Sequence, residues 1–385
     1  MDVSTVLASI RQSIDDEELI SITYELEDFS ERKLYHQLTL SLENFYKIAN
    51  EDLKVQIFNQ FISTLTKKLN SYKVTDFLLK SFENNQQECL NKLIKLQSEI
   101  ESSEDENAKI YINLQISRFY ILLNDFEEAN KILDSLDNKF TMINNEFNSK
   151  INNAYYSTKC QYFKSKDNYN SFYTNGLLYL STLNELNETQ DVEVNKAKEL
   201  EFAFDLSISA LLGDKIYNFG ELILNNILEN LNNSPYQWLY DLIINLNNGD
   251  IKNFGENLTI SFDKFPKLKQ FQSFLNQKII IMSLVELISV KSILNKKLSF
   301  QEISEFTSTD LNDVEHLIIK CFSLNLFSGS IDQINKTLTI SYLQPRILNL
   351  NQIKTLHSHL KQWDEKVLNL SNDVHKNGGS LWIDT

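Results

Sequence analysis

The residue types that most often catalyse reactions or bind metals are sparse in this sequence. The 385-residue chain has five histidines, with none between His36 and His316. His357 and His359 are two positions apart in a helical pattern, so their side chains point in different directions, whereas an H-E-x-x-H zinc helix spaces its histidines four apart. His375 completes the set, and we expect no metal site.

The cysteines offer a nucleophile only together with a distant partner. Cys89, Cys160 and Cys321 are odd in number and form no C-x-x-C pair, a pattern that suits a reducing compartment and core thiols. No histidine lies near Cys160 in sequence, so an enzyme with a nonsequential site would need a thiol whose pKa is well below normal. The motifs G-x-G-x-x-G, G-x-x-x-x-G-K-[ST] and G-x-S-x-G do not occur. We expect no catalytic residue, no cofactor and no small-molecule substrate.

The composition favours helices and disfavours nucleic acid as a partner. Hydrophobic residues make up 42% of the chain, enough for a large core and for two or three domains. Only 8 glycines and 3 prolines occur, and no proline precedes Pro235, so residues that end strands and form tight hairpins are scarce. The formal net charge of −15 argues against a general affinity for phosphate backbones, which depends on Lys and Arg.

The sequence lacks the usual signals for secretion or membrane insertion. Its first residues, MDVSTVLASIRQSIDDEEL, do not place a basic region before an apolar one. The longest apolar run, IIIMSLVELI, is short and contains Glu286. We therefore expect a protein that is neither secreted nor membrane-spanning.

A glycine-bracketed phrase occurs twice: GDKIYNFGE begins at Gly213 and GDIKNFGE begins at Gly249. Amphipathic helical patterns precede and follow each copy, so each Gly-Asp pair is expected where one helix ends and the next begins. The glycines would supply left-handed caps, and Asp214 and Asp250 would accept free backbone N–H groups of the following helix. Both copies therefore predict a helix-turn-helix hinge.

Related turns elsewhere predict a helical repeat. Helical patterns are also interrupted at Asn-Asp 124–125 and Asp-Asn 167–168. Turns that recur roughly every 40 residues, with paired helices and no strands, are typical of an α-solenoid. The unit that starts at Ala108 resembles a tetratricopeptide-type repeat, in which Ala108 and Ala129 would be small packing residues.

From residue 277 the pattern becomes that of a winged helix. A helix over QKIIIMSLVELI, a short strand at KKLSF and a short helix at QEISEFT precede a longer helix that starts at DLNDVEHL, capped by Asp310 or Asn312. The alternating segments SGSIDQI and TLTISYL then predict two strands joined at Asn335-Lys336.

A winged helix can bind DNA or protein, and the charges favour protein. The would-be recognition helix begins with Asp310, Asp313 and Glu315, carboxylates that DNA phosphates would repel. A nucleic-acid-binding winged helix is the alternative from another functional class. The wing would instead offer a partner the open strand edge formed by Gly329, Ser330, Ile331, Asp332 and Gln333.

The last helical segment carries a regular apolar seam. Its spacing of 3 and 4 continues for three heptads, which predicts a helix that joins a bundle with helices of other chains. A core-facing helix folded onto its own solenoid is the alternative. Beyond Gly378-Gly379, Trp382 and Ile383 form either a docking hook or a frayed end. The seam consists of Ile353, Leu356, Leu360, Trp363, Val367, Leu370 and Val374.

Together these patterns predict a mostly α-helical chain with distinct parts. An exposed acidic loop is expected at residues 99–107. The predicted parts are a solenoid of paired, TPR-like helices at 1–276, a winged-helix module at 277–345, a long C-terminal helix at 346–375 and a flexible tail at 376–385.

The order of these parts resembles the PCI family, whose members occur in the proteasome lid, the signalosome and the third eukaryotic initiation factor. Three stretches, YFKSKDNYNSFYTNGLLYLSTL, FDLSISALLGDKIYNFGEL and NDVEHLIIKCFSLNLFSGSIDQINKTLTISYLQPRIL, are similar to non-ATPase lid subunits of the 26S proteasome regulatory particle. The resemblance covers residues 155–365 well and continues collinearly towards the N-terminus.

The resemblance implies a non-catalytic scaffold. In that family the winged helices pack side by side and the C-terminal helices gather into one bundle. The implied partners are other lid subunits: PCI neighbours, the helical bundle and MPN-type deubiquitinase subunits, with no nucleic acid or membrane partner. The implied location is the cytoplasm and the nucleus. A PCI subunit of the signalosome or of the initiation factor is the nearest alternative.

Overall fold

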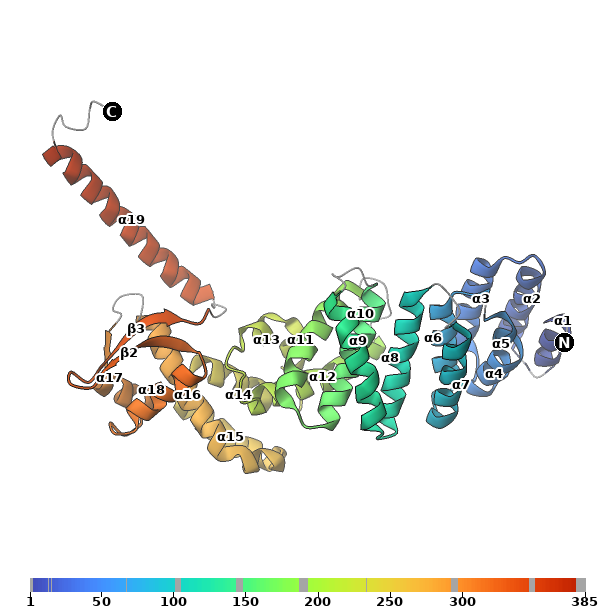
Figure 1. Ribbon diagram of the computed structural model, residues 1–385, viewed down its shortest axis with the longest axis horizontal. Coiled ribbons are helices and arrows are strands. Elements are labelled where there is room, and N and C mark those ends of the chain that lie inside the picture. Colours follow the sequence, from blue (N-terminus) through green and yellow to red (C-terminus); the bar gives the residue numbers. More distant parts are fainter. Residues whose placement is uncertain are drawn as a thin grey trace. The chain divides into compact units, whose positions relative to one another are not determined.

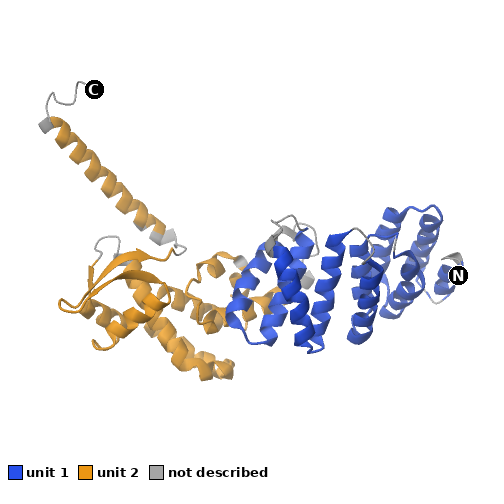
Figure 2. Ribbon diagram, viewed as in Figure 1, with its two compact units in different colours: residues 1–191 blue, residues 192–385 orange. Residues whose placement is uncertain are grey.

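The fold is mostly helical, as predicted, and divides into two compact units, residues 1–191 and 192–385 (Figures 1 and 2). Among the described residues, all strands lie between Lys297 and Leu343. The computed structural model describes residues 3–12, 14, 16–66, 68–100, 105–142, 148–186, 193–232, 234–291, 297–345 and 350–378.

The first unit is built from consecutive helices that pack side by side. Its elements are α1 (Val3–Arg11), α2 (Glu17–Glu31), α3 (Tyr35–Ile48), α4 (Glu51–Ile57), η1 (Phe58–Ile62), α5 (Ser63–Leu65), α6 (Ser71–Ser81), α7 (Gln86–Ile100), α8 (Glu106–Leu122), α9 (Phe126–Met142), α10 (Ser149–Ser165) and α11 (Tyr169–Leu186). Helix α2 packs on α3, α8 on α9 and α10 on α11 (Figure 1). Their apolar sides merge into continuous cores, which is how helical repeats gain stability.

Left-handed residues form the turns that join the two helices within the α8–α9 and α10–α11 pairs. Asn124 and Asp167 have φ of 63° and 52°. The N–H of Asp125 donates to the carbonyl oxygen of Tyr120 at 2.9 Å, and Asn168 makes the equivalent bond at 3.0 Å. Asn and Asp enter the left-handed region more readily than most residues, so these turns form without glycine. This explains how the glycine-poor part of the chain still turns between helices.

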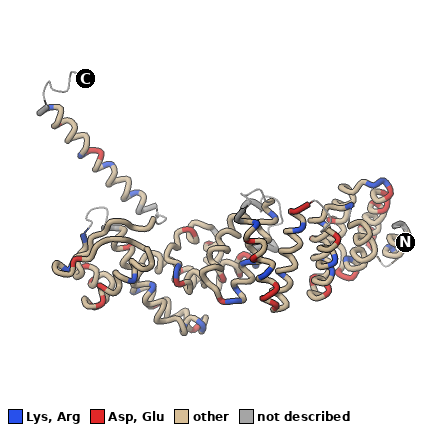
Figure 3. Tube along the Cα trace, in the orientation of Figure 1, with Lys and Arg blue, Asp and Glu red and all other residues tan. Residues whose placement is uncertain are grey.

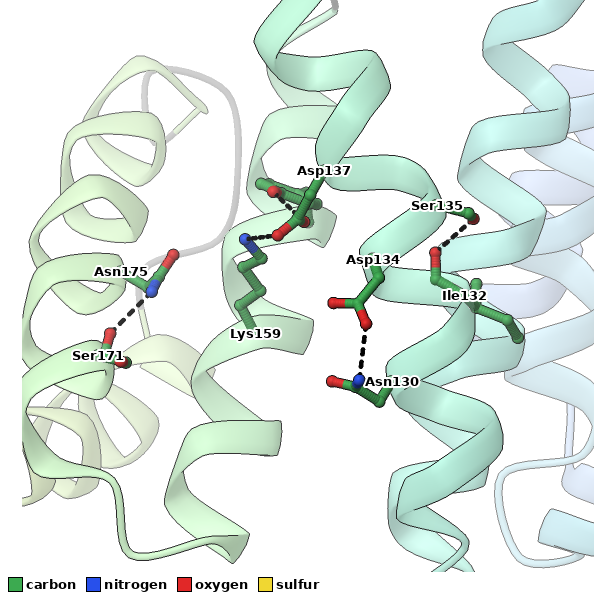
Figure 4. A network of polar contacts seen from close by, with 9 residues as sticks. Asn130, Ile132, Asp134, Ser135, Asp137, Lys159, Ser171 and Asn175 are labelled. Carbon is green, nitrogen blue, oxygen red and sulfur yellow. Dashed lines mark hydrogen bonds and ion pairs between the residues drawn. The ribbon is translucent and has the colours of Figure 1, made fainter.

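Polar contacts fasten α9 to α10 (Figure 4). Asp137 of α9 accepts hydrogen bonds from the Tyr155 hydroxyl at 2.6 Å and from the Lys159 ammonium at 2.8 Å, both on α10. The Tyr155 ring stacks on Phe140 with 4.0 Å between centroids. Burial, aided by the Asp137 carboxylate, raises the pKa of Tyr155, so its hydroxyl stays protonated and able to donate.

The acidic loop predicted at residues 99–107 overlaps two helices at its ends. Helix α7 continues to Ile100, and α8 already begins at Glu106. Asp105 caps α8, its carboxylate accepting the N–H of Ala108 at 3.4 Å, so acidic residues at this end belong to the helix. Residues 101–104 lie outside the described residues.

The second unit combines further helices with a small sheet and a long helix. Its elements are α12 (Glu193–Leu212), α13 (Gly220–Leu224), η3 (Asn226–Leu231), α14 (Gln237–Asn248), α15 (Ile251–Lys264), η4 (Pro266–Phe271), α16 (Gln272–Lys291), β1 (Lys297–Ser299), α17 (Phe300–Thr307), α18 (Val314–Ser323), β2 (Phe327–Asp332), β3 (Thr337–Leu343) and α19 (Leu350–Gly378).

Helix α16 is the apolar centre of this unit. Ile279, Met282, Leu284 and Ile288 are all buried along it. Among the described residues, the segment Pro266–Ser289 is the one helical stretch long and apolar enough to cross a membrane, and 56% of its apolar window is buried inside the protein. The core helix of a globular domain passes the same test, so this composition is weak support for a membrane span.

The two copies of the repeated phrase fold differently. In the second copy Gly249 is left-handed, with φ of 68°, and ends α14. Asp250 then caps α15, its carboxylate accepting the N–H of Asn253 at 3.3 Å. In the first copy Gly213 and Asp214 do lie between helices, but the predicted cap roles are wrong. Gly213 does not have a positive φ, and α13 begins only at residue 220.

The winged-helix elements follow in the predicted order from α16 to β3. The three strands are antiparallel in the order β1-β3-β2, so β3 is central. Ser299 and Glu302 form a capping box at the start of α17. Two local predictions are wrong. Helix α18 begins at Val314, because residues 311–313 form a turn, so Asp310 and Asn312 are not its caps.

The second local correction concerns the hairpin. Its turn spans residues 333–336 rather than Asn335-Lys336 alone, because Asp332 pairs with Thr337. The Asp332 carboxylate accepts the N–H groups of Ile334 and Asn335, both at 3.1 Å, which folds the four-residue turn.

The predicted domain boundaries stay predictions. Residue 277 lies inside α16, which begins at Gln272, and the compact units divide at residue 191. The C-terminal helix continues past the predicted end at residue 375 to Gly378.

Replacing Gly249 with alanine is expected to destabilise the second unit, while replacing Gly255 is not. A Cβ at Gly249 would lie 2.8 Å from the Cα of Ser283, on a backbone with φ of +68°. A Cβ at Gly255, inside α15, would meet nothing within 4 Å. We expect Gly249→Ala to lower the free energy of unfolding by roughly 1–3 kcal/mol, and Gly255→Ala to raise it by about 0.5–1 kcal/mol. Urea unfolding of both variants measures this, and equal effects would contradict the assignment.

Candidate protein-interaction surfaces

The predicted seam residues lie along α19 and are uncovered. Apart from the half-buried Leu356, they expose between 46% and 67% of their surface, with Trp363 the most exposed. Leu368, missing from the predicted set because the 3-4 spacing skips it, is 54% exposed. Monomeric proteins rarely expose a continuous apolar stripe of this length. The seam's role as an interface stays a prediction, and this exposure is the observation that supports it.

Charged residues are distributed along α19 between the apolar positions of the seam (Figure 3). They keep a helix with one apolar side soluble and can select partners at the margins of a bundle. Trp382 and Ile383, the predicted tail hook, lie outside the described residues. The charged residues beside the seam are Lys354, Lys361, Asp364, Glu365 and Lys366.

The predicted wing edge belongs to β2, an outer strand of the sheet. A bulge precedes Gly329, and a Cβ there would lie 2.1 Å from the carbonyl oxygen of Thr339, so this position requires glycine. The strand continues to Asp332. Gln333 begins the turn, so it is not part of the strand edge, and its amide donates to Glu315 at 2.5 Å.

A residue that the sequence patterns did not single out holds the end of α12. Lys278 of α16 is 1% exposed. Its ammonium donates to the carbonyl oxygens of Ala210 at 2.8 Å, Leu211 at 3.1 Å and Gly213 at 2.6 Å. A helix leaves its last carbonyls without intrahelical partners, and a cation complements this negative end of the helix dipole. Lys278 therefore caps the C-terminal end of α12, the role that was predicted for Gly213 in a left-handed conformation.

Aromatic rings and a carboxylate surround this ammonium. The rings of Tyr217, Phe219 and Phe274 have centroids 5.4–5.6 Å from the Nζ of Lys278. Burial lowers the pKa of Lys278 to about 7, and the Asp214 carboxylate opposes this shift. The available sequence signal was a lysine directly before the longest apolar run of the chain, because a lysine buried with that run needs polar partners.

Comparison with known proteins decides the family. The PSD13 N-terminal repeats family matches residues 22–243, and the PCI domain family matches residues 261–341. The chain belongs to the PSD13 family. It is similar to 26S proteasome regulatory subunit RPN9 of Saccharomyces cerevisiae, with 36% identity over 397 aligned residues that cover 99% of each chain.

Further relatives of this PSD13-family chain come from other eukaryotes. The probable 26S proteasome regulatory subunit rpn9 of Schizosaccharomyces pombe is 34% identical over 93% of this chain and 92% of its own. The 26S proteasome non-ATPase regulatory subunit 13 homolog B of Arabidopsis thaliana is 33% identical over 89% of this chain and 90% of its own. The predicted resemblance to PCI-type non-ATPase subunits is confirmed.

The cysteines of this PSD13-family chain do not form a reactive site. Cys89, Cys160 and Cys321 are free and buried, and burial raises the pKa of each to about 12. An enzyme with a nonsequential site would need a thiol whose pKa is lowered, and these raised pKa values contradict that alternative. Among the described residues, no group of three or more His, Cys, Asp or Glu is placed to hold a metal ion. The prediction that the chain is not an enzyme is confirmed by a family named for non-ATPase regulatory subunits.

Replacing Lys278 with methionine is expected to destabilise the second unit of this PSD13-family chain. Methionine retains much of the apolar stem but leaves three buried carbonyls without a donor, a loss of about 2–4 kcal/mol in the free energy of unfolding. Lys320→Met is the control, because the Lys320 ammonium bonds Gln277 at the surface. Urea unfolding at pH 7 compares them, and equal stability of the two variants would contradict the capping role.

The same lysine is expected to give stability a characteristic pH dependence. Its folded pKa of about 7 lies below the unfolded value near 10.4, so between these values the unfolded chain binds more protons. The contribution of Lys278 to the free energy of unfolding should therefore rise with pH in this window, by up to about 1.4 kcal/mol per unit, and level off below pH 7. Lys278→Met should lack this rise. Urea unfolding from pH 6 to pH 10 tests it, and identical slopes in both proteins would refute the shift.

Proposed function

We propose that this chain is a non-catalytic scaffold subunit of the lid of the 26S proteasome regulatory particle, which supports lid assembly and ubiquitin-dependent protein degradation. The single observation that carries the proposal is the uncovered apolar seam of α19, in a chain that aligns with regulatory subunits along nearly its whole length. A scaffold needs surfaces that are incomplete until partners cover them, and this seam is such a surface.

The seam supports a bundle with helices of neighbouring subunits. A heptad stripe on a 29-residue helix presents knobs that fit between the side chains of a facing helix. Burying an apolar side chain fully contributes about 1.5–3 kcal/mol to stability. Because the seam side chains are roughly half exposed, the isolated chain gains only about half of this free energy from them. Bundle formation is therefore the largest gain in apolar burial open to α19.

The wing supports a second kind of contact. Strand β2 is an outer strand with a bulged start, so its free side can receive a neighbouring PCI subunit. The proposed partners are the PCI neighbours, the bundle helices and the MPN-type subunits of the lid. The proposed location is the cytoplasm and the nucleus, supported by the three free, buried cysteines, which suit a reducing compartment.

Capture of assemblies from the source cells tests the proposal. The full chain is used as bait beside a chain that ends at Asn349, and the captured complexes are weighed by native mass spectrometry. The full chain should recover a many-subunit lid, and loss of α19 should abolish or trim this assembly. Recovery of no large assembly by the full chain would overturn the proposed function, and recovery of a signalosome or initiation-factor complex would replace it.

A point-variant experiment separates the seam from the helix as a whole. Trp363→Asp with Leu370→Asp places carboxylates in the seam, whereas Gln362→Asp with Asn372→Asp places the same groups on other sides of α19. We expect the seam pair to reduce lid recovery at least tenfold and the control pair to leave it within twofold. Equal recovery by both pairs would move the anchor away from the seam.

A further inference from the structure

Three exposed apolar side chains lie in the turn before α18, on α18 itself and in the turn of the β2–β3 hairpin. Leu311, in the turn that leads into the helix, is 47% exposed, and Ile319, on the helix, is 50% exposed. Ile334, in the turn of the β2–β3 hairpin, is 93% exposed. Scattered apolar residues are common on protein surfaces, so their relation to one another and to nearby charges decides what they mean.

A hydrogen bond brings the hairpin turn next to α18. The side-chain amide of Gln333 donates to the carboxylate of Glu315 at 2.5 Å. Glu315 and Ile319 are four residues apart, so they share one side of the helix. Ile334 directly follows Gln333 in the turn. The resulting α18–hairpin surface consists of Leu311, Asp313, Glu315, Ile319, Gln333 and Ile334.

The turn holds Ile334 in a defined place. The Asp332 carboxylate accepts the backbone N–H groups of Ile334 and Asn335, and also the side-chain amide of Asn335 at 2.8 Å. Isoleucine is branched at Cβ and has few rotamers to lose. A fixed turn and a stiff side chain reduce the entropy lost when a partner binds, so Ile334 is suited to act as an anchor.

The charges on this surface select the chemistry of the partner. On this surface Asp313 is exposed and Glu315, four residues before Ile319, is half-buried, and the exposed Asp310 directly precedes Leu311 in sequence. One exposed lysine, Lys336, ends the hairpin turn two positions after Ile334. The nearby Lys320 ammonium is bonded to Gln277 of α16. A phosphate backbone would be repelled here, whereas Lys and Arg can pair with the carboxylates and lay their apolar stems along the isoleucines.

From this complementarity we infer that the α18–hairpin surface binds a protein segment in which apolar side chains are flanked by Lys or Arg. The surface uses side chains, so it is separate from the backbone edge of β2, and it lies on other elements than the α19 seam. The inference goes beyond the scaffold role proposed above, because that role requires neither the acidic residues nor Ile334.

Site-specific photocrosslinking in the source cells tests the inference. A photoreactive amino acid replaces Ile334 in the full chain, and the matched control places it at Ile260, an exposed isoleucine of α15 (51%). Both sites are at the surface, so the fold should persist, which circular dichroism checks. We expect crosslinks from position 334 at least fivefold above the control, to a protein segment with apolar residues beside Lys or Arg, and a loss of at least fivefold with Glu315→Lys.

Several outcomes would overturn the inference. They are a yield at position 334 no higher than at position 260, adducts on a neutral or acidic segment, adducts on nucleic acid, and a yield that Glu315→Lys leaves unchanged. The experiment needs no assumption about which complex holds the chain. Its failure therefore differs from failure of the scaffold proposal, which the capture of complexes by the full chain measures.

Discussion

The apolar side of every helix in this chain must be covered, and the rest of the structure depends on how that requirement is met. In the first unit each helix is covered by its neighbours, so that side chains such as Phe45, Phe61 and Phe77 are completely buried. In the second unit α16 serves as the shared core of the helices and the winged module. Helix α19 has an equally regular apolar side that stays exposed. Single apolar side chains such as Ile260 are exposed on other described helices, but α19 exposes a regular stripe, and this difference is what the proposed role in assembly rests on.

Lys278 shows what happens where apolar burial meets the polar end of a helix. The end of α12 and the irregular segment after it lie against α16, so terminal carbonyls would be buried without donors. One ammonium serves three of them and is itself removed from water, which lowers its pKa. A buried charge without partners is costly, and so are buried carbonyls without donors. The lysine and the three carbonyls therefore stabilise the fold only when they are buried together. The set fixes the join between a repeat helix and the first helix of the winged module.

Local spacing was sufficient to predict the features that depend on near neighbours in sequence. The 3-4 seam, the alternating strands of the hairpin and the Asn-Asp and Asp-Asn turns belong to this class. The role of Lys278 could not be predicted, because its acceptors lie 65 to 68 residues away. For the same reason the two Gly-Asp phrases differ: at residue 249 the caps are local, while at residue 213 a distant lysine replaces them. The start of α18 was misplaced because three polar residues, each a plausible cap, lie within four positions.

Hydrogen–deuterium exchange of α19 in the free chain and in the assembled particle tests the central claim most directly. If other subunits cover the seam, backbone amides of Leu350–Gly378 should exchange rapidly in the free chain and at least about 100-fold more slowly in the assembly. Amides of α16, which is covered within the chain itself, should exchange slowly in both. Equal exchange of α19 in the two states would contradict the account, because the seam would then remain uncovered or would already be covered by its own chain.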